Sequence, residues 1–368
     1  MTWRHGATPA LAGLLLTLPV LAAERWEVQY FYDRYDSTLA LLDLQFPSPQ
    51  QGVALGVVLE GNRRRPVVVV TGDGGRKWEL LPLKEPGRSL YFLNPQAGWM
   101  VGERGRLWSS ADAGRTWAPM KASGVKATPL RVFFADAFRG WLLCSQKQVY
   151  STTDGGQSWR LLEASQKPDL PPATTLWAAA AFQGPTGLLA GWSRPGDSAA
   201  RLPEWMDPER AWGRSPATTL LLHTADGGQT WKFVALEKLG QVARLAWSGD
   251  RPLLLAQRAD SLEAPTRILS LDLQALKAQQ LYSDNSRWLT DVAVAGKRLL
   301  AAGVAVSGRA PAPSIPARLV IIERTASGRW VEMAVDYRAE ARRAVLAAAG
   351  EQAWIATDTG MILNLVNR

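Results

Sequence analysis

The sequence predicts an all-β fold, a seven-bladed β-propeller in which an N-terminal strand closes the last blade. Three observations lead to this prediction. One eight-residue pattern recurs four times, short apolar runs typical of β-strands flank each copy, and the copies stand about one blade apart. The steps between their aspartates are 39 (73 to 112), 42 (112 to 154) and 72 (154 to 226) residues. A four-stranded blade takes about 40 residues, and the long last step indicates an insertion.

Each copy of the pattern is typical of a tight turn between two strands. The copies, called octets below, occupy residues 71–78, 110–117, 152–159 and 224–231. We expect the octet aspartate to accept hydrogen bonds from backbone amides two or three residues ahead, and glycine to supply the positive φ of the loop. Tryptophan then covers the hairpin with apolar area. These structural roles fall to Asp73, Trp78, Asp112, Trp117, Asp154, Trp159, Asp226 and Trp231.

The octets do not predict a catalytic or calcium-binding site. Each octet offers one carboxylate, whereas a calcium loop needs several oxygen ligands within one short stretch. Turn chemistry already accounts for every aspartate in the pattern.

Around the octets the chain divides into seven units of roughly one blade each. Their approximate bounds are 37–85, 87–122, 128–165, 173–238, 241–284, 287–336 and 340–368. The last unit has only three strand-like runs, and residues 26–32 supply a fourth. Pairing these two segments closes the ring and removes two exposed sheet edges. Residues 24–368 are therefore expected to form a single propeller domain.

Residues 1–23 are typical of a signal peptide. Arg4 and His5 precede an uncharged segment whose apolar centre, 10–22, is too short for the roughly 20 residues that a membrane-spanning helix needs. We expect cleavage after Ala22 or Ala23 and a periplasmic or otherwise exported protein. No later stretch holds eighteen uninterrupted apolar residues, so we expect no membrane span once the signal is removed.

The composition excludes several kinds of site. The hydrophobic content of 47% and the charged content of 20% are those of a globular protein. Cys144 is the single cysteine, and His5 and His223 are the only histidines. A disulfide framework, a zinc site of several thiolates and a histidine cluster are therefore excluded, and we expect neither metal nor cofactor. The net charge of +9 is scattered along the chain, and with export it argues against nucleic acid as a partner.

Two further motifs carry a family resemblance. The segments Ala97-Gly98-Trp99 and Arg139-Gly140-Trp141, with the ending 353–362, are similar to the photosystem II stability/assembly factor-like family of exported seven-bladed propellers. The octets match the Asp-box, or BNR repeat, on which that family is built. The resemblance covers most of the chain, although the fifth and sixth units lack a good octet. It implies a non-enzymatic accessory factor, without catalytic residues, that binds a membrane-protein complex or transporter.

Two other classes of function stay open. Sialidase-like and glucanase-like glycoside hydrolases also carry Asp-boxes. A sialidase would need an early Arg-Ile-Pro motif, whereas Arg267-Ile268-Leu269 lacks the proline and falls in the fifth unit. Glycosidases generally use two facing carboxylates, and the sequence singles out no such pair. The second alternative is a ligand-binding structural protein of the cell envelope.

Strand order predicts where a partner binds. The octets join the third strand of a blade to the fourth, so the connections from the second strand to the third must emerge on the opposite face of the disc. Four of these connections are enlarged, at 60–65, 193–216, 259–265 and 307–316. Arginine and tryptophan are frequent among interface hot spots. The candidate partner-binding residues in these connections are Arg63, Arg64, Arg65, Trp205, Arg210 and Trp212.

Overall fold

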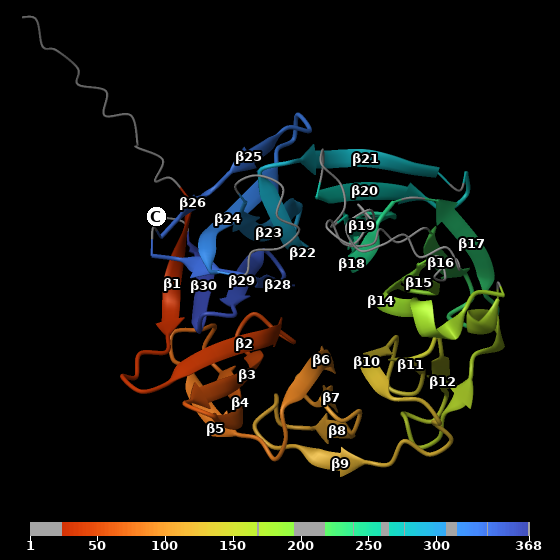
Figure 1. The fold of residues 1–368 in the computed structure, drawn as a ribbon, viewed down its shortest axis with the longest axis horizontal. Coiled ribbons are helices and arrows are strands. Elements are labelled where there is room, and N and C mark those ends of the chain that lie inside the picture. The colour runs from red at the N-terminus through yellow and green to blue at the C-terminus, as the bar shows by residue number, and fades with distance from the viewer. Residues whose placement is uncertain are drawn as a thin grey trace, which may run out of the picture.

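Seven β-sheets, antiparallel except for one short parallel pairing, stand around a common axis in the part of the chain that the structure describes (Figure 1). This computed structural model describes residues 24–366 except 168, 195–217, 238, 259–264, 276, 307–314 and 337. In six blades the strands run in chain order from the axis to the rim. The predicted fold class, an all-β seven-bladed propeller, is confirmed. Among the described residues, no helix is long and apolar enough to cross a membrane.

Blades 1, 2 and 3 each contain four strands in chain order. Blade 1 contains β2 (Thr38–Gln45), β3 (Gly52–Glu60), β4 (Arg63–Thr71) and β5 (Glu79–Pro82). Blade 2 contains β6 (Gly87–Asn94), β7 (Ala97–Gly102), β8 (Leu107–Ser110) and β9 (Ala118–Met120). Blade 3 contains β10 (Pro129–Phe134), β11 (Gly140–Cys144), β12 (Val149–Thr152) and β13 (Arg160–Leu161). Two short 3₁₀ turns, Glu163–Gln166 and Pro172–Thr174, lead from blade 3 to blade 4.

Most strands of the next three blades are longer than those of blades 2 and 3. Blade 4 contains β14 (Thr175–Gln183), β15 (Thr186–Ser193), β16 (Thr218–Thr224) and β17 (Lys232–Glu237). Blade 5 contains β18 (Gln241–Ser248), β19 (Arg251–Gln257), β20 (Thr266–Asp272) and β21 (Lys277–Asp284). Blade 6 contains β22 (Arg287–Ala295), β23 (Arg298–Ala305), β24 (Ala317–Arg324) and β25 (Trp330–Glu332), and the short β27 (Glu340–Ala341) pairs with β24.

The seventh blade joins the two ends of the described chain. Its inner strands are β28 (Ala344–Ala349), β29 (Gln352–Thr357) and β30 (Met361–Val366), and β1 (Arg25–Phe31) pairs antiparallel with β30. The N-terminal strand therefore closes the ring, as the sequence predicts. A short strand from the link after blade 6, β26 (Ala334–Val335), pairs parallel with β1 on its outer side, which the sequence did not predict. Trp26 of β1 is fully buried beneath this closure.

Stacked aromatic rings join neighbouring blades at three places in the described part of the chain. A phenylalanine at or just after the end of an inner strand stacks on a tryptophan in the second strand of the preceding blade. The stacked pairs are Phe46–Trp354, Phe134–Trp99 and Phe182–Trp141, with ring centroids 3.5, 3.8 and 4.2 Å apart. The octet tryptophan of the same blade meets each phenylalanine edge-on, and these tryptophans are Trp78, Trp159 and Trp231. We call each set of three rings an aromatic junction.

The octets fold into turns held by a repeated set of hydrogen bonds. In the third octet, Thr152 Oγ1 donates to Asp154 Oδ1 over 2.7 Å and accepts the amide of Gly156 over 3.0 Å. Asp154 Oδ1 also accepts the backbone amide of Ser158 over 2.9 Å. That amide lies four residues ahead, one or two farther than expected, and the same amide contact recurs at Asp73, Asp112 and Asp226. Each octet thus ties both ends of its loop to one carboxylate.

These hydrogen bonds predict a specific acid sensitivity. Hydrogen bonds from Ser158 and Thr152 hold the pKa of Asp154 well below its ordinary value, and those from Thr230 and Thr224 do the same for the pKa of Asp226. A folded-state pKa below the unfolded one gives stability that is fully present above the unfolded value of about 3.9 and is lost as the pH falls toward the folded value. The double variant Asp154→Asn and Asp226→Asn lacks this contribution.

We therefore expect the melting temperature of the double variant to fall less steeply than that of the wild type between about pH 4 and pH 2, as followed by circular dichroism. A matched control changes two exposed turn aspartates outside the octets, Asp33→Asn and Asp250→Asn. Parallel melting curves for the wild type and the octet variant would contradict the inference.

Ring closure by β1 gives a second prediction. A chain that starts at residue 32 leaves β30 and β26 with unpaired edges and removes the buried Trp26. We expect this truncated chain to aggregate or to lose its cooperative melting transition, whereas a chain that starts at residue 24 stays monomeric. Size-exclusion chromatography with thermal melting checks this. A truncated monomer with an unchanged melting transition would show that closure does not depend on β1.

Candidate interaction face and central channel

The two faces of the disc are built from different connections. On one face, which we call the octet face, the octets contact the turns from the first strand to the second: the amide of Gly74 donates to the carbonyl of Gln50 over 2.8 Å. On the other, which we call the channel face, connections from the second strand to the third contact the segments that lead into the inner strands. There the amide of Glu103 donates to the carbonyl of Pro86 over 2.8 Å.

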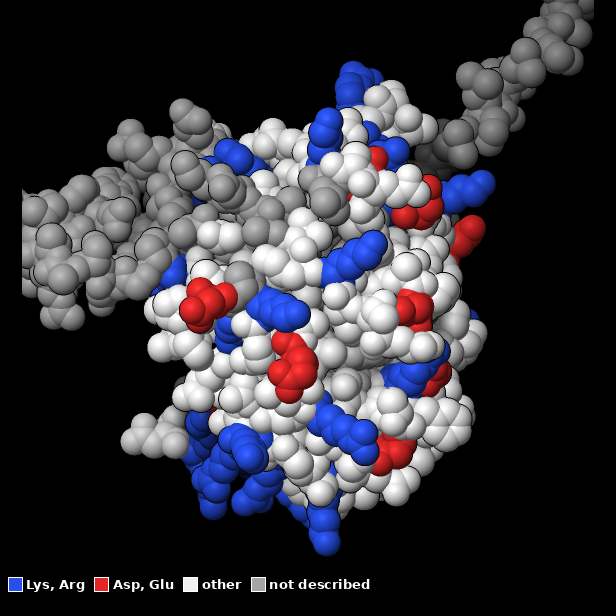
Figure 2. Space-filling view, turned by 90° about the vertical axis from the view of Figure 1, so that its right-hand side faces the viewer, with Lys and Arg blue, Asp and Glu red and all other residues white. Residues whose placement is uncertain are grey.

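The channel face carries an excess of basic side chains. Its connections in blades 1, 2 and 7 contribute the exposed residues Arg63, Arg64, Arg65, Lys84, Arg88, Arg104, Arg106, Lys126, Arg342 and Arg343. The octet face mixes lysines and arginines with the carboxylates of its turns, among them Asp73, Asp112, Asp136, Asp154 and Asp226. Seen edge-on, Lys and Arg side chains gather at the lower left margin of the disc with almost no acidic residue among them (Figure 2).

The predicted arginine cluster lies on the channel face. Arg63, Arg64 and Arg65 begin β4 and are exposed. Arg64 Nη2 forms an ion pair with Glu103 Oε1 of blade 2 over 2.7 Å, and Arg65 Nε lies 3.5 Å from Glu60 Oε2. Exposed pairs of this kind contribute little stability, so these arginines can exchange partners at low cost.

The other predicted partner-binding residues lie outside the described residues. They are Trp205, Arg210 and Trp212, within 195–217. The same holds for residues 1–23 and for most of the enlarged connections at 259–265 and 307–316. Their assignment stays a prediction.

The inner strands share a backbone irregularity that the sequence analysis missed. In six of the described inner strands a β-bulge falls at the same register relative to the second strand, as at Leu41/Asp43 and Leu289/Asp291. A bulge re-aims the side chains beside it. The residues at and after the bulges form a ring around the axis, and those after the bulge are Asp43, Ser89, Arg131, Ala179, Arg244 and Asp291.

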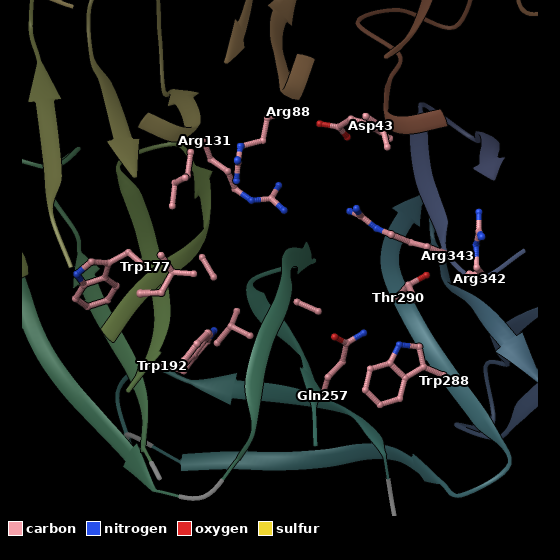
Figure 3. Close-up of a pocket in the computed structure, with 16 residues that line it drawn as sticks. Asp43, Arg88, Arg131, Trp177, Trp192, Gln257, Trp288, Thr290, Arg342 and Arg343 are labelled. Carbon is pink, nitrogen blue, oxygen red and sulfur yellow. The ribbon is translucent and has the colours of Figure 1, made fainter. Parts of the chain in front are cut away.

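A cavity of about 620 Å³ lies at the axis, bounded by the bulge residues, by the start of the inner strands and by the ends of two second strands. Arg131 and Arg343 point into it from opposite sides (Figure 3). Gln257, Trp192 and Trp288 also line it. Because the second strands end and the inner strands begin at the channel face, the cavity belongs to that face.

The two channel aspartates connect inner strands to one another. Asp43 Oδ2 accepts the amide of Leu90 in the next blade over 2.7 Å. Asp291 Oδ2 accepts the amide of Leu346 in its next blade over 2.9 Å, and Arg244 Nε lies 3.1 Å from Asp291 Oδ1. Burial raises the pKa of Asp291, although Arg244 and the backbone amides oppose that shift. These carboxylates are therefore engaged in holding blades together.

Arg131 is partly buried, whereas the other arginines that line the cavity, Arg88, Arg342 and Arg343, are exposed. Burial lowers the pKa of Arg131; Asp43 counteracts this shift, whereas the charges of Arg244 and Arg343 add to it. A guanidinium stays protonated despite such a shift. The channel therefore holds a fixed positive charge that its surroundings only partly compensate.

In the described part of the chain, no group of three or more His, Cys, Asp and Glu side chains could hold a metal ion. Cys144 is buried in β11, and burial raises the pKa of its thiol to about 12.

Comparisons with known proteins find the same fold among solved structures. No protein-family model and no curated protein matches the chain. Among solved structures, one described as YCF48 bound to D1 peptide has a TM-score of 0.62 at 17% identity, over 96% of this chain and 100% of that chain. YCF48 from Cyanidioschyzon merolae has a TM-score of 0.59 at 14% identity, over 92% and 98%. A catalytically inactive virginiamycin B lyase from Staphylococcus aureus with quinupristin has a TM-score of 0.57 at 10% identity, over 93% and 100%. At these identities the likeness shows a shared propeller fold.

Proposed function

We propose that this chain is an exported accessory factor that binds a membrane protein or a membrane-associated complex through its channel face. The observation that carries the proposal is the basic surface of that face, where blades 1, 2 and 7 present exposed arginines and lysines with few acidic partners. Complementary charge speeds encounter with an acidic partner and favours one docking orientation.

The construction of the disc supports this choice of face. The octet aspartates are engaged in internal hydrogen bonds, and the octets also contact neighbouring turns. Rigid scaffolds commonly carry recognition on loops such as the connections of the channel face. A structure with the same fold is described as bound to a peptide, D1, which supports a binding role for this architecture.

Binding is proposed in preference to glycoside hydrolysis. A glycosidase needs one carboxyl to donate a proton and another to act as nucleophile or base. Asp43 and Asp291 each accept two backbone amides, which favours a structural use of both carboxylates. Export rests on the signal-like residues 1–23, which lie outside the described residues.

Charge reversal on the channel face tests the proposal. We expect Arg63→Glu, Arg64→Glu and Arg65→Glu together to lower recovery of membrane proteins from envelope extracts by about tenfold at low salt and by less at about 0.3 M salt, because salt screens surface charge. The melting temperature should stay nearly unchanged. Pull-down with quantitative mass spectrometry measures the recovery.

The control reverses three cations of the octet face, Arg76→Glu, Lys77→Glu and Arg115→Glu, which changes the net charge by the same amount. It should recover the same membrane proteins as the wild type. Equal losses in both triple variants, or none in either, would place the binding surface elsewhere.

A further inference from the structure

The channel holds more positive charge than the blades neutralise. Two of its arginines have carboxylate partners: Arg342 with Asp358 over 2.7 Å and Arg244 with Asp291 over 3.1 Å. Arg342 lines the cavity of about 620 Å³, whereas Arg244 lies outside its lining. Three other arginines line the cavity, Arg88, Arg131 and Arg343, and no ion pair joins any of them to another of the described residues. Asp43 supplies the one carboxylate among the residues that line the cavity, beside these three cations.

The carboxylate of Asp43 already accepts hydrogen bonds from the backbone. Asp43 accepts the amides of Leu44 and Leu90, over 3.0 and 2.7 Å, so both of its oxygens are used. The three unpaired guanidinium groups and this carboxylate leave about two positive charges at the cavity. A guest with two negative charges would balance them.

The arrangement of the unpaired arginines is that of a clamp. Arg131 and Arg343 reach into the cavity from blades 3 and 7, on opposite sides of the axis (Figure 3). A guanidinium presents its N–H groups as a planar fork that matches carboxylate or phosphate oxygens. Two forks that face each other across a cavity suit a ligand with an anionic group at either end, or one phosphate between them.

The rest of the lining indicates an organic ligand. The cavity volume of about 620 Å³ lies in the range of small-molecule sites, which is about 300–1,000 Å³. Indole and aliphatic groups of Trp192, Trp288 and Leu42 line its wall. Gln257 Nε2 donates to the carbonyl of Leu289 over 2.7 Å, which leaves its amide oxygen free to accept from a ligand hydroxyl.

We propose that the central channel binds a small organic dianion, a dicarboxylate or a phosphate monoester, between Arg131 and Arg343. The site is separate from the exposed arginines at 63–65 and does not require the proposed membrane partner. It gives the propeller a ligand of its own, a role that the client-binding function does not include.

The proposal is tested on purified protein without any partner. We expect isothermal titration calorimetry to show saturable binding of malate or of phenyl phosphate with a Kd below about 1 mM, and each bound ligand to raise the melting temperature. Acetate at matched ionic strength should do neither. The malate and phenyl phosphate arms distinguish a carboxylate from a phosphate ligand, and inorganic phosphate is titrated beside them.

Substitutions of Arg131 and Arg343 test whether these two arginines bind the ligand. Arg131→Gln and Arg343→Gln should each weaken binding of the preferred probe by at least about tenfold, whereas Arg76→Gln on the octet face should leave it unchanged. Arg343 is exposed where the channel opens on the channel face. Its replacement therefore keeps the test informative if Arg131→Gln disturbs folding.

Three outcomes would overturn the proposal. These are no binding of malate or phenyl phosphate at about 10 mM, an unchanged Kd in Arg343→Gln, or binding of inorganic phosphate alone. Loss of partner capture by the variant at 63–65, with dianion binding retained, would leave this inference standing, so the two proposals fail separately.

Discussion

The stacking of an inner-strand phenylalanine on a tryptophan of the preceding blade is the interaction on which the octet-bearing half of the ring depends. It uses six of the 17 tryptophans, since in each junction one indole supplies the stacked partner and a second, from the octet, meets the phenylalanine edge-on. It also explains the glycine before Trp99 and before Trp141. A Cβ at Gly98 or Gly140 would collide with the phenylalanine ring of the same blade, Phe92 or Phe134. Each glycine therefore leaves room for the phenylalanine of its own blade, and the tryptophan that follows it stacks on the phenylalanine of the next blade.

At three of the four places where the stacked pair is missing among the described residues, polar groups of the channel join neighbouring blades. Blade 1 has Val53 where other blades have the stacking tryptophan, and there Asp43 bonds the amide of Leu90 in blade 2. Blades 5 and 6 have no aromatic junction to the blade that follows them. Arg244 pairs with Asp291 between these two blades, and Asp291 bonds Leu346 in blade 7. The buried acids are thus a structural substitute for aromatic stacking, and a half-satisfied network of this kind would be costly in a buried channel.

The sequence predicted the parts of the fold that repeat and missed the parts that depend on register. The octets and apolar runs have fixed spacing, so blade number and closure by the N-terminal segment followed from them. The channel residues did not follow, because a bulge shifts the inner strand by one residue and turns Asp43 or Arg131 to a side that simple alternation does not indicate. The sequence does contain a signal for them. Asp43 and Arg131 each interrupt an apolar strand, and both lie at the same distance from the turn that follows. Trp205, Arg210 and Trp212 lie outside the described residues, so their part in binding stays a prediction.

The two proposed sites meet at the rim of the channel, and this places a physical condition on how they act together. Arg343 and Arg88 are exposed on the channel face and also line the cavity. A dianion bound between Arg131 and Arg343 would cancel positive charge at the centre of the surface proposed to attract an acidic partner. Each ligand would then weaken binding of the other by the same factor, because a coupling free energy between two sites is reciprocal. The coupling would fall with added salt, since the charges of the rim face water. A membrane partner that instead placed its own carboxylates in the channel would compete directly with the dianion. Saturating dianion would then abolish binding of the partner, whereas electrostatic coupling alone would only weaken it.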